Sequence, residues 1–408
     1  MSEIFVASTF FTGLILTLAL VVLGARAVLR VKGVARLTLN GGRVIEGELD
    51  ETLLNLLDQG DVHLPTSCGG VGTCGLCRVK ISGGGENDSV LPIERVTLND
   101  AEITEGFRLA CQMVVRGDFD VTVPLTLLVA KNWQCTVLGT RTLAPLIKEI
   151  ILALPEGTSH IFPAGCYVIM VAPPFSLPFS DIEIRPEHEA DWQRMGLRQL
   201  QATSDLEQCR AYSLVNRPGD TDRLILNIRL ALPPGTNPDA PPGVVSSYLF
   251  GLKEGDMVLA SGHYGNFFVQ ETNREMILIG GGVGMAPLYA HVYDQLKRLN
   301  SKRTISYWYG ARGLLDLYYA DEMEKLALEN ENFSWHVALS DPAPDEKWAG
   351  ERGFIHDVIY RKYLGSHPDP QNCEYYLCGP PLMIQSVHAM LNRLGVPWEN
   401  IFHDDFGD

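Results

Sequence analysis

"CGGVGTCGLC", from Cys68 to Cys77, places three cysteines and four glycines within ten residues. Nine cysteines among 408 residues are too sparse for a disulfide scaffold, which indicates a reducing compartment. The close spacing of the three cysteines in this stretch is typical of metal ligands. Cys111 completes the pattern C-x5-C-x2-C-x33-C. A 2Fe-2S cluster needs four thiolates, and glycines permit the unusual dihedral angles of a ligand loop. We therefore predict such a cluster, with the ligands Cys68, Cys74, Cys77 and Cys111.

A structural zinc site and buried thiols are the alternatives to this cluster. Structural zinc sites more often pair two CxxC knuckles, and only one is present.

Upstream, "VARLTLNGGRVIEGEL" (34–49) predicts two strands, and "DETLLNLLDQG" (50–60) predicts a helix with Asp50 as N-cap and Gly60 at its end. Together these segments resemble the β-grasp ferredoxin domain, in the longer-loop variant of vertebrate-type ferredoxins and some reductases. Four cysteines then fill the coordination sites, so His63 is interpreted as structural.

Composition limits the size and the partners of the protein. With 408 residues, 46% of them hydrophobic, the chain can form two or three cores, because a single core rarely grows past about 250 residues. The formal net charge of -16 would repel a phosphate backbone. Nucleic acid is therefore not an expected partner.

The N-terminus predicts a membrane anchor. "IFVASTFFTGLILTLALVVLG" (4–24) carries no charge and is long enough for a hydrocarbon core of about 30 Å, which takes roughly 20 helical residues. A cleaved signal peptide, the alternative, would have a basic leader and a shorter apolar core, whereas Glu3 makes this leader acidic. Basic residues beyond the span place everything after residue 25 in the cytoplasm by the positive-inside rule; they are Arg26, Arg30, Lys32 and Arg36. We expect a single pass through a membrane, in contact with its lipid.

Two further patterns follow along the chain. Between Trp133 and Val269, β-type alternation broken by Pro and Gly predicts an antiparallel barrel. Segments near 185–208 and 232–242 interrupt it as expected surface insertions, which could meet lipid, a subunit or a lid, or could be solvated loops. After Asn273, short apolar strands alternate with helices, which predicts a parallel sheet. The predicted domains are an anchor (1–30), an α+β ferredoxin domain (31–128), an antiparallel barrel (129–271) and an α/β domain with a parallel sheet (272–408).

Two motifs in the barrel segment resemble the flavin motifs of the ferredoxin-NADP reductase superfamily: "RAYS" (210–213) and "GVVSSY" (243–248). The resemblance implies that Tyr212 stacks on the isoalloxazine, Ser213 bonds flavin N5 and Arg210 neutralises a pyrophosphate. It also implies FAD rather than FMN, with the pyrophosphate at a helix start made by Gly243, Val244, Val245 and Ser246. Asn227 and Arg229 lie on a strand that touches the cofactor in this superfamily, and alternation alone does not say which one faces it.

The segment "ILIGGGVGMAPLYA" (277–290) reads as a strand, a glycine turn and a helix, an arrangement that directs amides at a pyrophosphate. It matches the GGGxGxxP version of the same superfamily, through Gly280, Gly281, Gly282, Gly284, Met285 and Pro287. A tight packing turn is the alternative. Only one arginine, Arg312, precedes acidic residues after the next strand, which favours NADH over NADPH.

A second strand end carries "CGPP" (378–381), and in this superfamily that cysteine lies near the nicotinamide C4. Cys378 is therefore the predicted hydride-site residue, with Gly379 and Pro380 beside the dinucleotide; an ordinary buried thiol is the alternative. Phe406, near the chain end, is predicted to cover the flavin face, or else merely packs. The remaining cysteines are interpreted as ordinary thiols: Cys135, Cys166, Cys209 and Cys373.

The order of anchor, ferredoxin domain, FAD barrel and NADH domain resembles the F subunits of bacterial Na+-translocating NADH:quinone oxidoreductases. This resemblance implies hydride transfer from NADH to FAD, then single electrons to the cluster and to partner subunits that reduce ubiquinone and export Na+. The nearest rival is the reductase component of a multicomponent monooxygenase, which is usually soluble and lacks the span at 4–24. A non-catalytic iron-sulfur scaffold would have no reason to keep flavin and dinucleotide motifs.

Overall fold

The computed structural model describes residues 13, 17, 33–60, 62–66, 69–73, 75–83, 90–124, 131–233, 240–344 and 347–404. It divides into two compact units. The first covers the described residues through Leu64 and those between Gly70 and Leu125, and the second those from Thr126 onward with the short stretch Pro65–Gly69. Apart from Gly13 and Thr17, the predicted span lies outside the described residues. Within the described part of the chain, no helix has the length and apolar character needed to cross a membrane.

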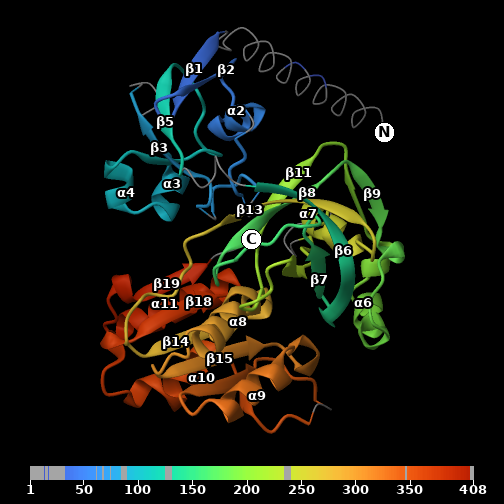
Figure 1. The fold of residues 1–408 in the computed structure, drawn as a ribbon, viewed down its shortest axis with the longest axis vertical. Helices are drawn as coiled ribbons and strands as arrows, with labels where there is room; N and C mark the ends of the chain where they lie inside the picture. The colour runs from blue at the N-terminus through green and yellow to red at the C-terminus, as the bar shows by residue number, and fades with distance from the viewer. Residues whose placement is uncertain are drawn as a thin grey trace, which may run out of the picture. The chain divides into compact units, whose positions relative to one another are not determined.

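The first unit contains a five-stranded mixed sheet in the order β2-β1-β5-β3-β4 (Figure 1). Its elements are β1 Val34–Leu39, β2 Arg43–Glu48, α2 Leu53–Gln59, β3 Arg78–Ser82, α3 Pro92–Thr97, α4 Asp100–Thr104, β4 Phe107–Leu109 and β5 Phe119–Thr122. Strand β1 pairs antiparallel with β2 and parallel with β5, while β3 pairs antiparallel with β4 and β5. The predicted hairpin and the helix after it are both present.

The start of α2 differs from the sequence-based prediction. Asp50 adopts a left-handed conformation, with φ of 68°, in the turn before the helix. Thr52 is the N-cap instead, and its side chain accepts a hydrogen bond from the Asn55 N–H. The helix ends at Gly60 as predicted.

A buried ion pair stabilises the segment that precedes Cys111. Glu94 of α3 is fully buried and Arg108 of β4 is 4% exposed. Their side chains make two bonds, from Nε at 2.9 Å and from the terminal nitrogen at 2.6 Å. Glu94 also accepts the backbone N–H of Leu109 at 2.9 Å. The carboxylate therefore joins α3 to β4.

Replacing Glu94 with glutamine should destabilise this unit by about 3–5 kcal/mol, because Arg108 would lose the carboxylate that compensates its buried charge. Hydrogen exchange of the backbone amides of β3 and β4 measures this local stability. The matched control is Glu46→Gln, which removes an exposed partner of Arg36 and should cost less than about 1 kcal/mol. Equal protection of both variants would contradict the prediction.

The first half of the second unit contains a six-stranded antiparallel sheet in the order β11-β8-β13-β6-β7-β12. Its strands are β6 Lys131–Ala144, β7 Ile147–Ala153, β8 Tyr167–Ala172, β11 Gln208–Ser213, β12 Arg223–Arg229 and β13 Met257–Tyr264, and helix α7 is Val244–Gly251. A single antiparallel bridge between Leu214 and Leu226 links the two outer strands. Their apolar side chains form a core that includes Leu249 and Phe250 of α7.

The predicted insertion near 185–208 has regular structure and is anchored to this core by Trp192, Leu197 and Ala202, although most of its residues are exposed or half-buried. It contains helix α6 Glu189–Arg194, strand β10 Gln201–Ser204 and short 3-10 helices at Pro186–His188 and Leu197–Gln199. Strand β9 Phe175–Pro178, which pairs with β10, and a 3-10 helix at Phe179–Asp181 precede it. Trp192 is fully buried, and its indole N–H donates to the Pro145 carbonyl at 2.7 Å. Arg198 donates to the carbonyls of Phe179 and Ile182. Of the second predicted insertion, residues 234–239 lie outside the described residues.

Lys148, on β7, is an unusual member of this core because its side chain is only 1% exposed. Its ammonium group donates to the Phe250 carbonyl at the end of α7. Burial lowers the pKa of Lys148 from 10.5 to about 8, with a smaller opposing effect of Glu183. The folded protein therefore releases this proton more readily than the unfolded chain.

Between pH 8 and 10.5 the unfolded chain binds the Lys148 proton and the folded protein does not, so stability should rise with pH in this window. Relative to a Lys148→Met variant, the wild type should gain about 3 kcal/mol from pH 7.5 to 10.5. Thermal unfolding of both proteins across this range measures the difference. Parallel pH profiles would show that Lys148 does not titrate as expected.

The second half of this unit contains a six-stranded sheet in the order β17-β16-β15-β14-β18-β19, and its five pairings are parallel. The strands are β14 Met276–Gly281, β15 Ile305–Ala311, β16 Phe333–Leu339, β17 Glu351–Arg352, β18 Glu374–Cys378 and β19 Ile401–Asp404. The helices are α8 Met285–Tyr293 with its π-helical continuation Asp294–Arg298, α9 Ala320–Glu329, α10 Ile355–Lys362 and α11 Pro381–Arg393. Short 3-10 helices lie at Gly282–Gly284, Leu314–Asp316, Leu364–Ser366, Pro370–Asn372 and Trp398–Asn400.

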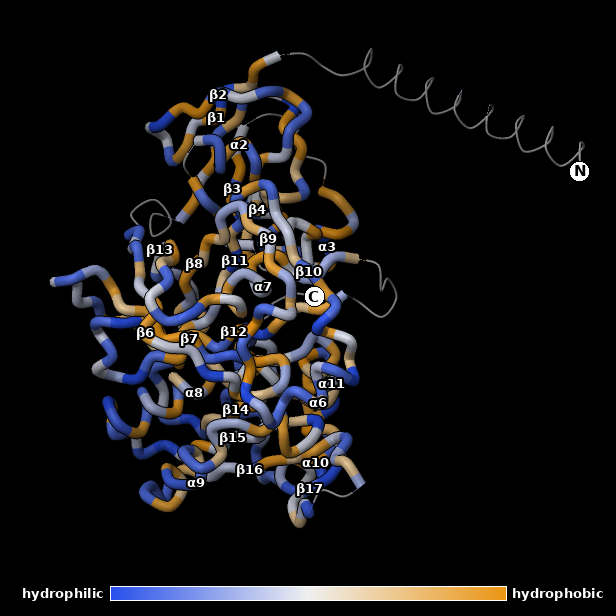
Figure 2. Tube along the Cα trace, turned by 90° about the vertical axis from the view of Figure 1, so that its right-hand side faces the viewer, coloured by the Kyte–Doolittle hydropathy of each residue, from blue (hydrophilic) through white to orange (hydrophobic). Residues whose placement is uncertain are grey.

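Helices cover both faces of this parallel sheet. Apolar side chains of α8 and α9 pack on one face with Leu278 and Tyr307, whereas those of α10 and α11 pack on the other with Ile277 and Trp308 (Figure 1). The hydropathy along these elements can be followed in Figure 2. A three-layer arrangement of this kind brings the carboxyl ends of β14 and β18 to one edge, which is where the two glycine motifs lie.

Candidate functional site

Two of the four predicted cluster ligands are described, and strand pairing brings them together. Cys77 directly precedes β3 and Cys111 follows β4. The Ala110 N–H donates to the Cys77 carbonyl at 3.0 Å, next to the Arg78–Leu109 pair of the ladder. Cys77 is 1% exposed and Cys111 is 7% exposed. Cys68 and Cys74 lie outside the described residues, so the full ligand set stays a prediction.

The loop glycines adopt the conformation that the cluster prediction requires. All four have φ between 67° and 94°, the left-handed region that favours glycine; they are Gly69, Gly70, Gly72 and Gly75. Gln112 holds this loop, because its amide Nε2 donates to the Gly70 carbonyl at 2.6 Å and lies 3.5 Å from the Cys111 sulfur. Sequence reasoning missed Gln112, although its position next to a predicted ligand was a signal. His63 contacts Asp58.

The first flavin motif lies on β11. Alternate residues of a strand share a face, so Arg210 and Tyr212 point to the same side of the sheet. Tyr212 packs partly against the apolar core, and burial raises its pKa, which keeps the hydroxyl protonated. The Arg210 guanidinium donates to the Cys209 carbonyl at 2.7 Å.

The second flavin motif is the start of α7, and Gly243 is its N-cap. The backbone N–H of Ala231, just after β12, donates to the Ser246 hydroxyl at 3.2 Å, and that hydroxyl donates to the Gly243 carbonyl at 3.1 Å. A Cβ at Gly243 would lie 2.7 Å from the Ala231 Cβ, so the close approach requires glycine. The amides of the first turn have no partner within the helix, as at any α-helix start. Such amides suit an anionic group.

The structure separates Asn227 from Arg229 on β12. Asn227 is 2% exposed, whereas Arg229 is exposed. The Asn227 amide oxygen accepts a bond from the Tyr319 hydroxyl at 3.1 Å. Its Nδ2 is buried and has no hydrogen-bond partner among the described residues. A buried donor of this kind is costly unless something accepts from it, so Asn227 fits a polar cofactor atom better than Arg229 does.

The dinucleotide motif joins β14 to α8 through the 3-10 helix Gly282–Gly284. Met285 and Pro287 lie in the first turn of α8 and are buried. The hydroxyls of Tyr309 and Tyr318 both donate to the Gly282 carbonyl, at 3.0 and 2.9 Å. Burial raises the pKa of each, so both remain donors at neutral pH. These tyrosines fix the turn, and sequence reasoning did not identify them.

The two glycine motifs lie in contact. Strand β14 pairs with β18, and Gly280 is the register partner of Cys378. A Cβ at Gly284 would lie 2.0 Å from the Cys378 carbonyl oxygen, and one at Gly379 would lie 3.0 Å from the Gly281 carbonyl oxygen. Cys378 is fully buried, and exposed Pro380 is the N-cap of α11. The residues predicted for the nicotinamide site are thus neighbours at one sheet edge.

A carboxylate that sequence reasoning missed joins the flavin strand to this edge. The Ser213 hydroxyl, at the end of β11, donates to the Asp404 carboxylate at 2.9 Å. Asp404 is also the register partner of Cys378 in the pairing of β19 with β18. Ser213, Asp404 and Cys378 therefore come together across 191 residues of sequence. Phe406 lies outside the described residues, so its predicted role as a cover remains a prediction.

The other cysteines differ from these. Cys135 and Cys166 are fully buried, and burial raises the pKa of each to about 12, which keeps the thiols protonated. Cys373 is also buried and lies near His367, which contacts Glu275 at 3.1 Å. The His367 Nδ1 accepts the Asp369 N–H, so its Nε2 carries the proton toward Glu275. This arrangement satisfies the imidazole without a metal ion.

The donors around these elements fit phosphate-bearing and flavin groups. The N-terminus of α7 offers amides, the glycine turn after β14 offers a second helix start, and Asn227 offers a buried N–H. Cys77 and Cys111, at the adjoining ends of β3 and β4, offer two thiolate ligands for iron. These residue types could therefore hold the three groups that the sequence predicts.

Two parts of the chain match known protein families. Residues 37–116 match the family described as "2Fe-2S iron-sulfur cluster binding domain", and residues 278–389 match "Oxidoreductase NAD-binding domain". Among solved structures, Amycolatopsis cytochrome P450 reductase GcoB gives a TM-score of 0.62 at 26% identity, covering 92% of this chain and 99% of that one. The ferredoxin reductase in carbazole 1,9a-dioxygenase, at 22% identity and a TM-score of 0.58 with the same coverage, shows a likeness of fold.

Curated relatives match the whole chain. The F subunit of the Na(+)-translocating NADH-quinone reductase from Neisseria meningitidis is 44% identical over 405 residues, which cover 99% of this chain and 100% of that protein. The corresponding F subunit from Methylococcus capsulatus is 43% identical over 409 residues and covers both chains completely. Identity at this level along the entire length shows that the chain belongs to the family of Na(+)-translocating NADH-quinone reductase F subunits.

Proposed function

We propose that this chain is the electron-input subunit of a membrane respiratory complex. It oxidises NADH by hydride transfer to FAD and passes single electrons through a 2Fe-2S cluster to partner subunits, which reduce ubiquinone and export Na+. The observation that carries this proposal is the meeting of Ser213, Asp404 and Cys378 where the flavin strand reaches the dinucleotide edge. When bound, FAD supplies the exchange between two-electron and one-electron chemistry.

Each residue group has a distinct task in this proposal. Arg210 and the first-turn amides of α7 bind the FAD pyrophosphate, and Tyr212 packs beside the isoalloxazine. Ser213 presents its hydroxyl oxygen to the flavin as an acceptor, because its one O–H donates a hydrogen bond to the Asp404 carboxylate, which orients the group. Cys378 provides a small, buried wall against which the nicotinamide ring approaches closely.

The dinucleotide in this proposal is NADH. The glycine turn after β14 binds its pyrophosphate. Arg312, which directly follows β15, forms an ion pair with Asp341 at 3.9 Å. A 2′-phosphate would meet Asp341 as well as Arg312, whereas a ribose hydroxyl can donate to such a carboxylate.

The domain boundaries and the anchor belong to the same proposal. We place an anchor at 1–30, the ferredoxin domain at 31–128, the FAD barrel at 129–271 and the NADH domain at 272–408. The uncharged run 4–24 holds the chain in the inner membrane in a single pass, with later residues in the cytoplasm. The partners are the other subunits of the complex and the surrounding lipid. The bridge between Leu214 and Leu226 supports closure of the FAD sheet into a barrel.

Anaerobic mixing with NADH tests the proposal directly. We expect NADH to bleach the flavin absorbance of the detergent-purified chain, followed by the EPR signal of a reduced 2Fe-2S cluster. Ser213→Ala should slow the bleaching by about 10- to 100-fold, because it removes the hydroxyl presented to the flavin. Flavin that stays oxidised beside excess NADH in the wild type would refute the proposal.

The likeness to GcoB and to a dioxygenase reductase favours a second candidate, a reductase for an oxygenase. Such a protein would use the same hydride site but a different electron acceptor. Purification from detergent-solubilised membranes separates the candidates, because integral membrane subunits should co-purify under the first and an oxygenase under the second.

A further inference from the structure

Tyr319, the residue before α9, has an unusual backbone. Its φ is 58°, in the left-handed region that bulky residues seldom adopt. A side chain keeps such a conformation only when its surroundings determine its position. The contacts of Tyr319 and of its neighbours therefore indicate what the conformation achieves.

The Tyr319 side chain crosses from the dinucleotide half of the second unit to the flavin half. Its hydroxyl contacts the Glu149 carboxylate of β7 and the Asn227 amide oxygen of β12, the latter at 3.1 Å. Glu149 and Asn227 are register partners in the antiparallel ladder. Arg141 holds Glu149 from the other side at 3.1 Å. The hydroxyl is thus attached to two adjacent strands of the flavin sheet.

The side chain of Tyr318, the preceding residue, binds within the dinucleotide half instead. Its hydroxyl donates to the Gly282 carbonyl in the dinucleotide turn at 2.9 Å. The left-handed backbone at Tyr319 lets these consecutive side chains reach two different sites. One of them holds the turn that is proposed to bind the dinucleotide, and the other holds the strand that carries Asn227.

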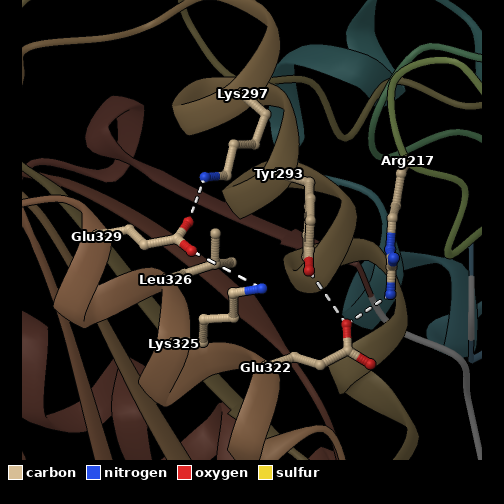
Figure 3. Close-up of a pocket in the computed structure, with 7 residues that line it drawn as sticks. All are labelled: Arg217, Tyr293, Lys297, Glu322, Lys325, Leu326 and Glu329. Carbon is tan, nitrogen blue, oxygen red and sulfur yellow. Dashed lines mark hydrogen bonds and ion pairs between the residues drawn. The ribbon is translucent and has the colours of Figure 1, made fainter.

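A third contact follows one helical turn later. The Glu322 carboxylate of α9 accepts hydrogen bonds from Arg217, which lies in the loop between β11 and β12, and from the hydroxyls of Tyr289 and Tyr293 on α8. The Arg217 guanidinium lies 4.7 Å from the centre of the Tyr293 ring. Figure 3 shows the Arg217 and Tyr293 side chains converging on Glu322.

These charges line a pocket of about 400 Å³ with Lys297, Lys325, Leu326 and Glu329. Lys297 and Lys325 both pair with Glu329, at 2.6 and 3.8 Å, and Arg217 pairs with Glu322. Each basic side chain thus already has an acidic partner. We interpret the pocket as a set of ion pairs that joins the flavin half to the dinucleotide half, rather than as a ligand cavity.

We propose that Tyr319 is a positioning residue for hydride transfer, which places the dinucleotide turn relative to the flavin strands. Tyr318, which binds the turn, and the ion pair between Arg217 and Glu322 support this placement. The inference rests on the proposed function. Hydride transfer needs its donor and acceptor atoms, the nicotinamide C4 and the flavin N5, about 3–3.5 Å apart, and a misplacement of about 1 Å can cost 100-fold in rate. A residue that touches neither reacting atom can therefore control the rate by fixing the distance between them.

The test is Tyr319→Phe in the full-length, FAD-loaded chain, because this change removes one hydroxyl and keeps the ring. Stopped-flow mixing with NADH should show flavin reduction about 10-fold slower, while the NADH dissociation constant and the FAD content stay within about twofold. The primary isotope effect with NADH deuterated at C4 should become larger or more temperature-dependent, since the donor and acceptor are less well placed.

Tyr375→Phe is the matched control. Tyr375 is a fully buried tyrosine of the same unit, whereas Tyr319 is half-buried, and the Tyr375 hydroxyl donates to the Pro370 carbonyl within the dinucleotide half. We expect its flavin reduction rate to equal that of the wild type. Glu149→Gln provides a second variant that weakens the same contact without changing shape, and it should slow reduction about threefold.

Two outcomes would overturn the inference: unchanged flavin reduction in both Tyr319→Phe and Glu149→Gln, or an equal decrease in Tyr375→Phe, which would indicate general loosening. Each differs from failure of the proposed function, in which NADH does not reduce the flavin of the wild type. If Tyr319→Phe does not fold, the Glu149→Gln rate and isotope effect decide the question in the same way.

Discussion

Alanine at position 284 is expected to lower NADH-dependent flavin reduction by at least about 100-fold. Gly284 has an ordinary φ of -61°, so the substitution brings no backbone strain. Its Cβ, however, would lie 2.0 Å from the Cys378 carbonyl oxygen, 2.3 Å from the carbonyl carbon and 2.7 Å from the Gly379 nitrogen. These are backbone atoms, which cannot rotate away as a flexible side chain can. The two glycine motifs would have to separate.

Stopped-flow flavin reduction measures the effect, and FAD content shows whether the flavin half remains intact. The matched control is Gly139→Ala on β6, in the same unit, where a Cβ would meet nothing within 4 Å. We expect that variant to keep its FAD and to reduce it within about twofold of the wild-type rate. A Gly284→Ala protein that does the same would show that contact between the two motifs does not determine nicotinamide placement.

Local motifs were the most predictable parts of the site. The glycines of the cluster loop were expected to need unusual dihedral angles, and Gly70 and Gly72 have φ of 89° and 94°. The strand, turn and helix around Gly282 were likewise readable, because glycine spacing and apolar runs are both encoded within a few residues. The segment near 185–208 was predicted as a surface insertion; most of its residues are exposed or half-buried, but its sequence did not indicate that Trp192 would be fully buried.

The residues that sequence reasoning missed act through long-range contacts. Asp404 is significant only because β19 pairs with β18 and because Ser213 reaches it from another sheet. Tyr318 and Tyr319 read as ordinary aromatic residues before a helix, and only their hydroxyl partners reveal the connection they make. No local pattern carries such information, because the partners lie on separate elements. The choice of Asn227 over Arg229 likewise depended on burial.

Replacement of Cys111 by alanine is the second change with a large expected effect. The first unit should lose its iron and acid-labile sulfide, because a 2Fe-2S cluster needs four thiolates and Cys111 is a predicted ligand. Quinone reduction by the assembled complex should then fall at least about 100-fold, since electrons could no longer pass from flavin to cluster. Flavin bleaching by NADH should remain within about twofold of the wild-type rate, because Ser213, Asp404 and Cys378 all belong to the other unit.

This separation of activities is what makes the experiment informative. A zinc site in place of the cluster would leave quinone reduction unaffected by iron content, and metal analysis of the wild type would show zinc instead of iron. Cys209→Ala, which removes a half-buried thiol from the other unit, should keep both iron and quinone reduction and so controls for the loss of any cysteine.

If Cys111→Ala retained a full cluster, the fourth ligand would have to come from elsewhere, and the spacing argument that begins at Cys68 would fail. If it lost flavin bleaching as well, the two units would depend on each other for hydride transfer, which the placement of the hydride-site residues within one unit does not predict.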